Sequence, residues 1–240
     1  MAVEIKSDLS YKPNQDIFSE TLQRLAAGDH NIIAVTSDSR GSGKLVKFGQ
    51  DFPEQIVEVG IAEQNLVGVA AGLASCDKKV FAVSPACFLT ARSLEQIKND
   101  ICYSNNPVTV VGISAGVSYG ALGSTHHSLH DFAALRAINN IIIVVPADNY
   151  ETGKATELAA ESKIPVYLRF GKKPMPFLTD QKEEFVFGKG RVIMEGEDVA
   201  IIANGETVYP ALRAAVKLKE AGIHATVVSM HTIKPLDTAL

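Results

Sequence analysis

The stretch IVEVGIAEQNLVGVAAGLAS, residues 56–75, indicates how the chain folds. Its first five residues form a short apolar run of the kind found in buried strands, and residues 62–76 have the length and spacing of a helix. Glu63 stands at the start of this helix, an acid among small and apolar residues. An acid in a first helical turn interacts favourably with the helix dipole, and ligands also collect where strands of a parallel sheet end. Spacing alone leaves both roles open.

The alternation of strand and helix continues along the chain. We expect strands at 31–38, 79–84, 107–114, 140–146 and 165–170, and helices at 14–30, 87–104, 128–138 and 149–162. This order predicts an α/β domain over residues 1–171, with a parallel sheet and helices on both faces. Residues 172–190, rich in Pro, Gly and charge, are predicted to be a linker. Residues 191–240 are predicted to begin a second, incomplete α/β domain with two strands and one helix.

Composition excludes several classes of function. Hydrophobic residues make up 46% and charged residues 21%, as in ordinary globular proteins, and a net charge of -4 offers no basic face for nucleic acid. The apolar runs are too short to span a membrane, because a span needs roughly 20 residues. The three cysteines, Cys76, Cys87 and Cys102, form no metal-binding or disulfide pattern, so we expect a cytoplasmic protein without a metal site of its own.

Five motifs in succession resemble the pyrimidine-binding domain of transketolases. They are VEVGIAEQNLVGVAAGLA (57–74), FLTARSLEQIKNDICY (88–103), GISAGVSYGALGSTHHSLHD (112–131), VVPADNYE (144–151) and VYLRFG (166–171). The resemblance covers nearly the whole chain and is strongest to the separately encoded C-terminal half of split transketolases. It implies a transferase that uses thiamine diphosphate to move a two-carbon ketol unit from a ketose to an aldose.

The resemblance also implies a cofactor site. Glu63 matches the family's catalytic glutamate, which binds N1′ of the cofactor's aminopyrimidine ring. Ile61 and Phe88 match residues that line and stack on that ring. The remaining cofactor positions are Arg92, Leu94 and Asp38. Leu94 stands where relatives usually carry an aromatic residue, so the aromatic wall is expected to be thinner here.

Substrate residues follow from the same resemblance. His126 matches a histidine that contacts the donor near its reacting carbons, and Arg169 matches the arginine that binds the distal phosphate, a role that suits its planar fork of donors. Ser37 borders the same cleft. Ser114 and Leu122 replace a His and an Asp found in other transketolases, which predicts a donor other than xylulose 5-phosphate, such as a branched or otherwise modified ketose.

One part of the family pattern is missing. The chain lacks the G-D-G motif, followed some thirty residues later by Asn, that holds Mg²⁺ and the diphosphate. The resemblance therefore implies a separately encoded N-terminal subunit that shares the cofactor and binds most of the Mg²⁺, in a two-fold assembly predicted to be a heterotetramer. The small residues Gly68, Ala70, Ala71 and Gly72 suit either a close helix crossing at that interface or packing within this chain.

Other interpretations remain open. The chain could belong to a deoxyxylulose phosphate synthase or be the beta subunit of a 2-oxo-acid dehydrogenase decarboxylase, or it could be a non-catalytic paralogue that only binds a partner. The order of FLTARSLEQIKND and HSLHD favours a transketolase. Asp131 and Arg136 are expected to form a surface or capping pair, and Glu58 is assigned no chemistry.

Overall fold

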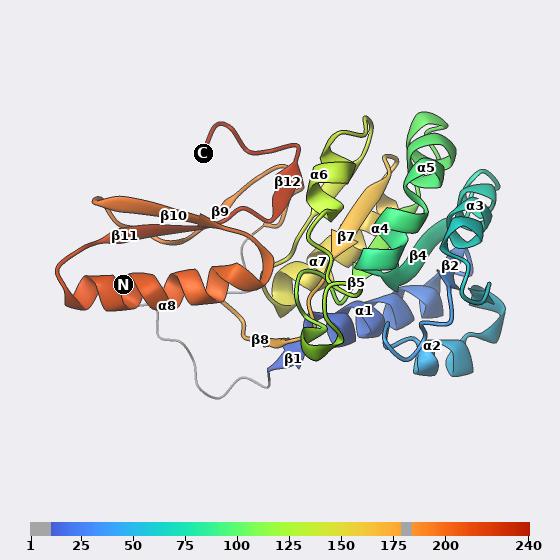
Figure 1. Ribbon diagram of the computed structural model, residues 1–240, viewed down its shortest axis with the longest axis horizontal. Helices are drawn as coiled ribbons and strands as arrows, with labels where there is room; N and C mark the ends of the chain where they lie inside the picture. Colours follow the sequence, from blue (N-terminus) through green and yellow to red (C-terminus); the bar gives the residue numbers. More distant parts are fainter. Residues whose placement is uncertain (1–10, 179–183) are drawn as a thin grey trace.

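The computed structural model describes residues 11–178 and 184–240. Its centre is a seven-stranded sheet in the order β12-β6-β7-β5-β4-β2-β3 (Figure 1). Every neighbouring pair is parallel except β12, which runs antiparallel to β6. The strands are β2 (Ile32–Thr36), β3 (Ile56–Glu58), β4 (Lys79–Pro85), β5 (Thr109–Ile113), β6 (Ile142–Val144), β7 (Val166–Arg169) and β12 (Thr232–Lys234). The predicted mainly parallel sheet is confirmed.

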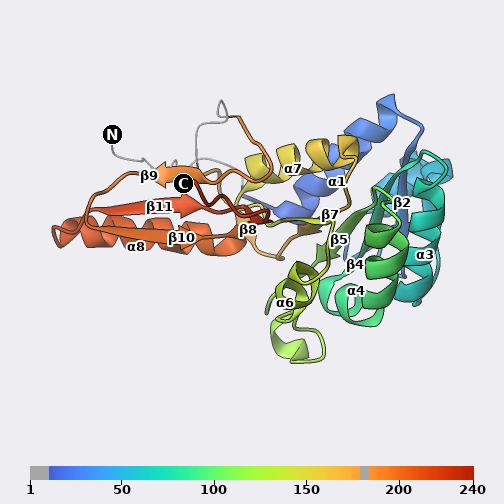
Figure 2. The same cartoon turned by 90° about the horizontal axis from the view of Figure 1, so that it is seen from above.

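Helices cover both faces of this sheet (Figure 2). One face carries α1 (Asn14–Gly28), α2 (Val46–Asp51) and α7 (Asn149–Glu161), and the other carries α3 (Glu63–Ala74), α4 (Ala86–Arg92), α5 (Leu94–Gln96), the π-helix η2 (Ile97–Tyr103) and α6 (Asp131–Arg136). Strand β2 contributes to the hydrophobic core on each face of the sheet: Ile33 and Val35 pack in one core, and Ile32 and Ala34 pack in the other. Both faces are buried, so successive residues from Ile32 to Val35 are apolar rather than alternating with polar ones.

The helix predicted over 87–104 is broken. Ser93 leaves helical geometry (φ -111°, ψ 24°), and its hydroxyl donates to the carbonyl of Leu89 at 2.5 Å. A serine that bonds to the backbone within its own helix competes with the helical ladder, and here α4 ends at Arg92. The chain continues through α5 into the π-helix η2, and π-helical turns are rare and frequent at functional sites. Hydrophobic spacing alone gave no sign of this break.

Some short elements also had no sequence signal, because they are too brief to show a period. They are β1 (Lys12–Pro13), which pairs with β8 (Pro174–Met175), β9 (Arg191–Met194), and the 3₁₀ turns η1 (Pro53–Gln55), η3 (Gly120–Leu122) and η4 (Gly205–Thr207). Strand β8 lies within the predicted linker, part of which falls outside the described residues.

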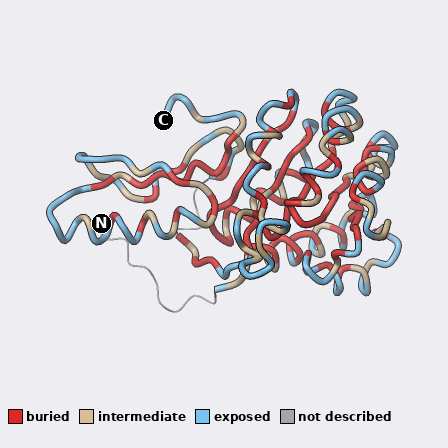
Figure 3. The backbone as a smooth tube through the Cα atoms, in the orientation of Figure 1, coloured by how far each residue is buried: buried red, intermediate tan, exposed pale blue. Residues whose placement is uncertain are grey.

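The C-terminal unit has more strands than predicted. Its own sheet has the order β10-β11-β9, with β10 (Val199–Ala203) parallel to β11 (Ala225–Ser229) and β9 antiparallel to it. Helix α8 (Val208–Glu220) packs on this sheet through Val208, Leu212 and Ala215. The segment 224–237 splits into β11 and β12, and β12 joins the large sheet. Figure 3 shows buried backbone running from the large sheet into β11 and exposed backbone on the outer side of α8.

The seam between the two units contains a buried ion pair. Arg191 of β9 donates to the Glu151 carboxylate of α7 at 2.9 Å, and Ser229 donates to the same carboxylate at 3.0 Å. Both partners of the pair are buried. Burial, and then the nearby Asp148 carboxylate, raise the pKa of Glu151 to about 7. Removing one partner of such a pair leaves a buried charge uncompensated, so the pair ties the C-terminal unit to α7.

His231 gives the seam a pH dependence. Its ring is fully buried, lies 4.1 Å from the Phe185 ring, and has no hydrogen-bond partner at Nε2 among the described residues. Burial, with Arg191 adding to it, lowers the pKa of His231 from 6.5 to about 3. As the pH falls, the unfolded chain therefore takes up this proton first, and the stability contributed by the neutral His231 is lost below about pH 6.5. Glu151, whose pKa is raised, has the opposite effect on stability over the same pH range.

We expect lowering the pH from 7 to 5 to reduce the free energy of unfolding by about 2 kcal/mol through His231 alone. His231→Phe keeps a ring against Phe185 and should lose that part of the pH dependence in denaturant melts at the two pH values. His224→Asn changes an exposed histidine and should melt like the wild type. An equal pH dependence in His231→Phe and the wild type would contradict the assignment.

Among residues 11–178 and 184–240, no helix combines the length and the hydrophobicity that a membrane span requires.

Candidate active site

The predicted site residues gather where the parallel strands end. The loops that follow β2, β4, β5 and β7 and the start of α3 all leave the same edge of the sheet. Side chains from segments far apart in the sequence meet there, as expected for an open parallel sheet. Glu63, Phe88, His126 and Arg169 all come from this edge.

Glu63 is the first residue of α3 and is 5% exposed. Arg92, at the end of α4, donates from Nη1 to Glu63 Oε1 at 2.9 Å. The other oxygen, Oε2, makes no hydrogen bond to any described residue. A buried carboxylate thus keeps one acceptor for a further donor, and Arg92, the last residue of α4 before the break at Ser93, lies beside it.

Aromatic side chains extend this site in one direction. The Arg92 guanidinium lies 4.4 Å from the centre of the Phe88 ring. The His126 ring meets the Phe88 ring nearly edge-on at 5.1 Å, and the Tyr119 ring meets His126 in the same way at 5.2 Å. Such edge-to-face contacts are favourable for aromatic rings, so the row holds the His126 imidazole in one orientation.

A glycine-rich loop presents His126. Gly116, Gly120 and Gly123 have φ of 62°, 56° and 76°, a region that other residues adopt at a cost. The turn puts Thr125 Oγ1 3.0 Å from His126 Nδ1, so Nε2 is the ring nitrogen left to meet a ligand. His127 contacts the carbonyl of Gly120 instead, at 3.2 Å, which distinguishes the two neighbouring histidines.

Arg169 lies at the end of β7 and is held by a buried acid. Its Nε donates to Asp131 Oδ2 at 2.6 Å, and Tyr167 donates to the same oxygen at 3.0 Å. Asp131 is 1% exposed. The expectation of a surface or capping pair with Arg136 is therefore wrong, because the acid at the start of α6 points into the core rather than to solvent.

Gly112 makes room for this arrangement. A Cβ at that position would collide with the Tyr167 hydroxyl oxygen. Burial and the Asp131 carboxylate raise the pKa of Tyr167 well above its usual value, so its hydroxyl stays a donor. Arg169 also donates from Nη2 to the carbonyl of Ser128 at 3.3 Å. Its guanidinium is therefore held on two sides, by Asp131 and by Ser128.

Glu58 orders the loop that carries Ser37 and Asp38. It accepts from the Asp38 and Gly60 N–H groups at 2.6 and 3.1 Å and from the Thr36 hydroxyl at 2.7 Å. Burial opposes ionisation, but these hydrogen bonds prevail and lower the pKa of Glu58. Asp38 is exposed with φ of 52°, and the Ser37 hydroxyl contacts that of Ser84 at 2.7 Å. Glu58 thus shapes the loop without belonging to the aromatic row.

Four predicted residues lie apart from this row. Ser114 is buried, and its hydroxyl is hydrogen-bonded to the side-chain amide of Gln15 at 3.1 Å. Ile61 and Leu122 are largely exposed, and Leu94 packs into the core under α3. None of the four is hydrogen-bonded or stacked with Glu63, Phe88 or His126 in the described part of the chain.

Comparison with known proteins identifies the family of the chain. Residues 12–176 match the transketolase pyrimidine-binding domain, and residues 188–240 match the transketolase C-terminal domain. The chain belongs to the transketolase family. Transketolases depend on thiamine diphosphate, and the chain is a transketolase-like transferase subunit.

Relatives of this transketolase chain include separately encoded subunits. It is 50% identical over 221 residues to one of the subunits of the apulose-4-phosphate transketolase of Phocaeicola vulgatus, covering 92% of this chain and 71% of that protein. It is 33% identical to a subunit of the 6-deoxy-6-sulfo-D-fructose transketolase of a Clostridium species, covering 93% and 69%. A solved split-gene transketolase, described as an inactive beta4 tetramer, superposes with a TM-score of 0.86 at 36% identity, covering 95% and 74%.

Sequence reasoning missed several residues of this candidate site. Tyr119, Asp131 and Tyr167 carry or support the predicted site residues, and Glu58 orders a loop beside them. The alternation that puts Arg169 on one face of β7 and Tyr167 two residues earlier on the same face was a usable signal. No sequence signal indicated that the acid at 131 would meet both.

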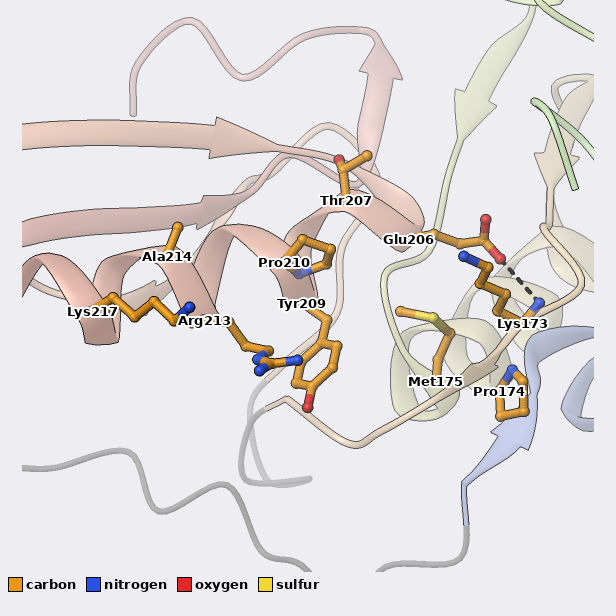
Figure 4. Close-up of a pocket in the computed structure, with 10 residues that line it drawn as sticks. All are labelled: Lys173, Pro174, Met175, Glu206, Thr207, Tyr209, Pro210, Arg213, Ala214 and Lys217. Atoms are coloured by element: carbon orange, nitrogen blue, oxygen red, sulfur yellow. Dashed lines mark hydrogen bonds between the residues drawn. The ribbon is translucent and has the colours of Figure 1, made fainter.

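A separate groove of about 780 Å³ runs along the seam between the two units (Figure 4). Its lining comes from the segment after β7 and from η4 and α8, and includes Lys173, Glu206, Tyr209 and Arg213. The Lys173 N–H donates to Glu206 Oε1 at 3.3 Å, and burial raises the pKa of Glu206. None of the predicted site residues lines this groove.

Proposed function

We propose that this chain supplies the pyrimidine-binding half of a two-chain transketolase and that Glu63 is its catalytic acid. The observation that carries the proposal is a carboxylate only 5% exposed that accepts from Arg92 on one oxygen and from no described residue on the other, with Arg92 also stacked on the Phe88 ring. A free acceptor next to an aromatic surface fits the aminopyrimidine of thiamine diphosphate. When bound, that cofactor supplies a carbon nucleophile.

The side chains of this protein then have distinct roles. Glu63 holds a proton at the ring nitrogen, and Phe88 provides a face for stacking, with Arg92 fixing both. Ile61, Leu94 and Asp38 border the cofactor where the partner closes over it. His126 contacts the donor near the reacting carbons, and Arg169 binds its anionic end. Ser37, Ser114 and Leu122 shape the substrate side, Ser114 and Leu122 by lacking the polar groups of other transketolases.

We also propose a separately encoded N-terminal subunit, a shared cofactor and Mg²⁺ held mainly by that subunit, in a two-fold heterotetramer. Apolar side chains in and beside the site loops support it, because they are mostly exposed: Ile61, Val117, Leu122 and Leu129. A Cβ at Gly68 or Gly72 of α3 would meet open space, which favours a crossing with another chain over packing within this one. Free cysteines support a cytoplasmic location.

The domain division remains our proposal: a pyrimidine-binding domain to residue 171, a connecting segment over 172–190 and a C-terminal unit over 191–240. The donor is proposed to be a modified ketose phosphate. The relatives from Phocaeicola vulgatus and the Clostridium species are not named for xylulose 5-phosphate. Ser114 and Leu122 offer no imidazole or carboxylate to a substrate hydroxyl.

A donor comparison with the assembled two-chain enzyme tests this function. Ketose phosphates should act as two-carbon donors to an aldose phosphate, with xylulose 5-phosphate well below the best of them, and pyruvate should give no product. Decarboxylation of pyruvate as fast as ketol transfer would instead favour a synthase or dehydrogenase activity. Efficient use of xylulose 5-phosphate would contradict the proposed donor class without contradicting ketol transfer.

A further inference from the structure

The cations around the site have their charges compensated within the chain, with one exception among the described residues. Each of three arginines has a carboxylate in ion-pair contact: Arg92 with Glu63 at 2.9 Å, Arg40 with Glu58 at 3.2 Å and Arg169 with Asp131 at 2.6 Å. Lys172 has no carboxylate within ion-pair distance among the described residues. It follows Arg169 by three positions, in the segment that leaves β7.

Because Asp131 compensates the positive charge of Arg169, the arginine attracts an anionic substrate less strongly. Its partner Asp131 is 1% exposed, so water does little to screen the pair, and together they carry no net charge. The guanidinium can still donate hydrogen bonds in a fixed direction. A phosphate dianion would thus be oriented by Arg169 but would find little net positive charge there.

Lys172 is placed to provide that charge. Its Nζ lies 4.6 Å from the centre of the Tyr119 ring, and Tyr119 in turn contacts the His126 ring. Tyr119 and His126 belong to the loop that begins and ends at the Gly116–Ser128 bridge, where Arg169 donates to the Ser128 carbonyl. The two cations therefore contact the same loop, Arg169 at its base and Lys172 at the ring beside His126.

We propose that Lys172 is a second contact for the anionic end of the donor and supplies the net positive charge that Arg169 lacks. The inference rests on the proposed function of Arg169 at that end of the substrate. Tyr119 holds the Lys172 ammonium through a cation–π contact. Because the lysine is exposed, a phosphate can reach it, and because it has no ion pair among the described residues, no such pair has to break first.

The chain offers a matched control in the next residue. Lys173 is also exposed, but it lines the seam groove with Glu206 and Tyr209 rather than the His126 loop (Figure 4). The same charge removed from Lys173 changes the net charge of the protein equally. Any difference between the two variants therefore reports the position of the lysine, not the overall charge.

The test uses the assembled two-chain enzyme, its best ketose phosphate donor and the same ketose without phosphate. Lys172→Gln should raise KM for the phosphorylated donor about tenfold, leave its kcat within about twofold, and leave both constants unchanged for the unphosphorylated sugar. Lys172→Arg should retain the wild-type KM, and Lys173→Gln should behave as wild type. Added salt should raise KM for the phosphorylated donor more in the wild type than in Lys172→Gln.

Arg169→Gln separates this inference from the function on which it rests. If Arg169→Gln raises KM for the phosphorylated donor alone while Lys172→Gln matches Lys173→Gln, the role of Lys172 is overturned and that of Arg169 stands. If Arg169→Gln affects both donors equally, the assignment of Arg169 fails, and a selective effect of Lys172→Gln would still support the lysine.

Discussion

Replacing Glu63 with Gln should lower turnover of the assembled enzyme by roughly two to four orders of magnitude, the range for loss of a positioned general acid or base. Glutamine keeps the size of the side chain and can still accept from Arg92, so folding and assembly should be retained. The substitution removes the acidity and the negative charge at a position that is 5% exposed, and the Arg92 side chain is half exposed, so solvent can stabilise its charge in the variant. Steady-state kinetics of the purified complex, with its mass checked for both variants, would measure the effect.

The matched control is Glu54→Gln, which changes an exposed acid in the turn before β3. It should keep wild-type turnover. If Glu63→Gln also kept full turnover, the chain would be a non-catalytic paralogue that only binds a partner. An intact complex that has lost turnover would exclude that alternative.

The chain alone should show no turnover above background, and adding the N-terminal subunit should restore activity up to a one-to-one ratio. The physical reason is that the described residues provide a surface for the pyrimidine ring, whereas the sequence has no motif for Mg²⁺ and the diphosphate. The solved relative described as an inactive beta4 tetramer is consistent with this expectation. A titration of the N-terminal subunit against a fixed amount of this chain, followed by ketol transfer, would measure it.

Substitutions at two leucines test whether the partner binds beside the site loop. Leu129 lies next to the site loop and is 72% exposed, whereas Leu158 lies on α7 and is 38% exposed. Leu129→Asp should raise the partner concentration for half-maximal activity about tenfold, and Leu158→Asp should not, because a charge is costly only where it becomes buried. Full activity of a preparation shown by mass to contain this polypeptide alone would contradict the two-chain proposal.

The strand and helix order could be predicted because the periods are strong. Apolar runs such as residues 31–38 and the helical spacing of residues 62–76 gave β2 and α3 within a few residues. Parallel pairing followed from the alternation of the two types. The break at Ser93 could not be predicted, because Thr90 makes the same hydroxyl-to-carbonyl bond four residues back and leaves α4 intact, so this bond alone marks no helix end. Strands of two residues such as β1 and β8 have no period to detect.

The position of the candidate site could be predicted from the sequence, but its supporting contacts could not. The edge of the sheet and the position of Glu63 followed from the strand–helix junction, and the resemblance named Phe88, His126 and Arg169. The supporting contacts did not follow, because they join residues distant in sequence: Asp131 meets Arg169 across 38 positions, and Arg92 meets Glu63 across 29. Such pairs depend on how α4 and α6 pack on the sheet, which no local pattern records.

The most direct test is the rate at which the C2 hydrogen of thiamine diphosphate, bound to the assembled enzyme, exchanges with deuterium from solvent. Quenched-flow mixing with proton NMR would compare the wild type with Glu63→Gln at saturating cofactor. If Glu63 relays the proton through the pyrimidine ring, exchange should be at least about a hundredfold slower in the variant. Equal exchange rates in two complexes with equal cofactor occupancy would contradict the account.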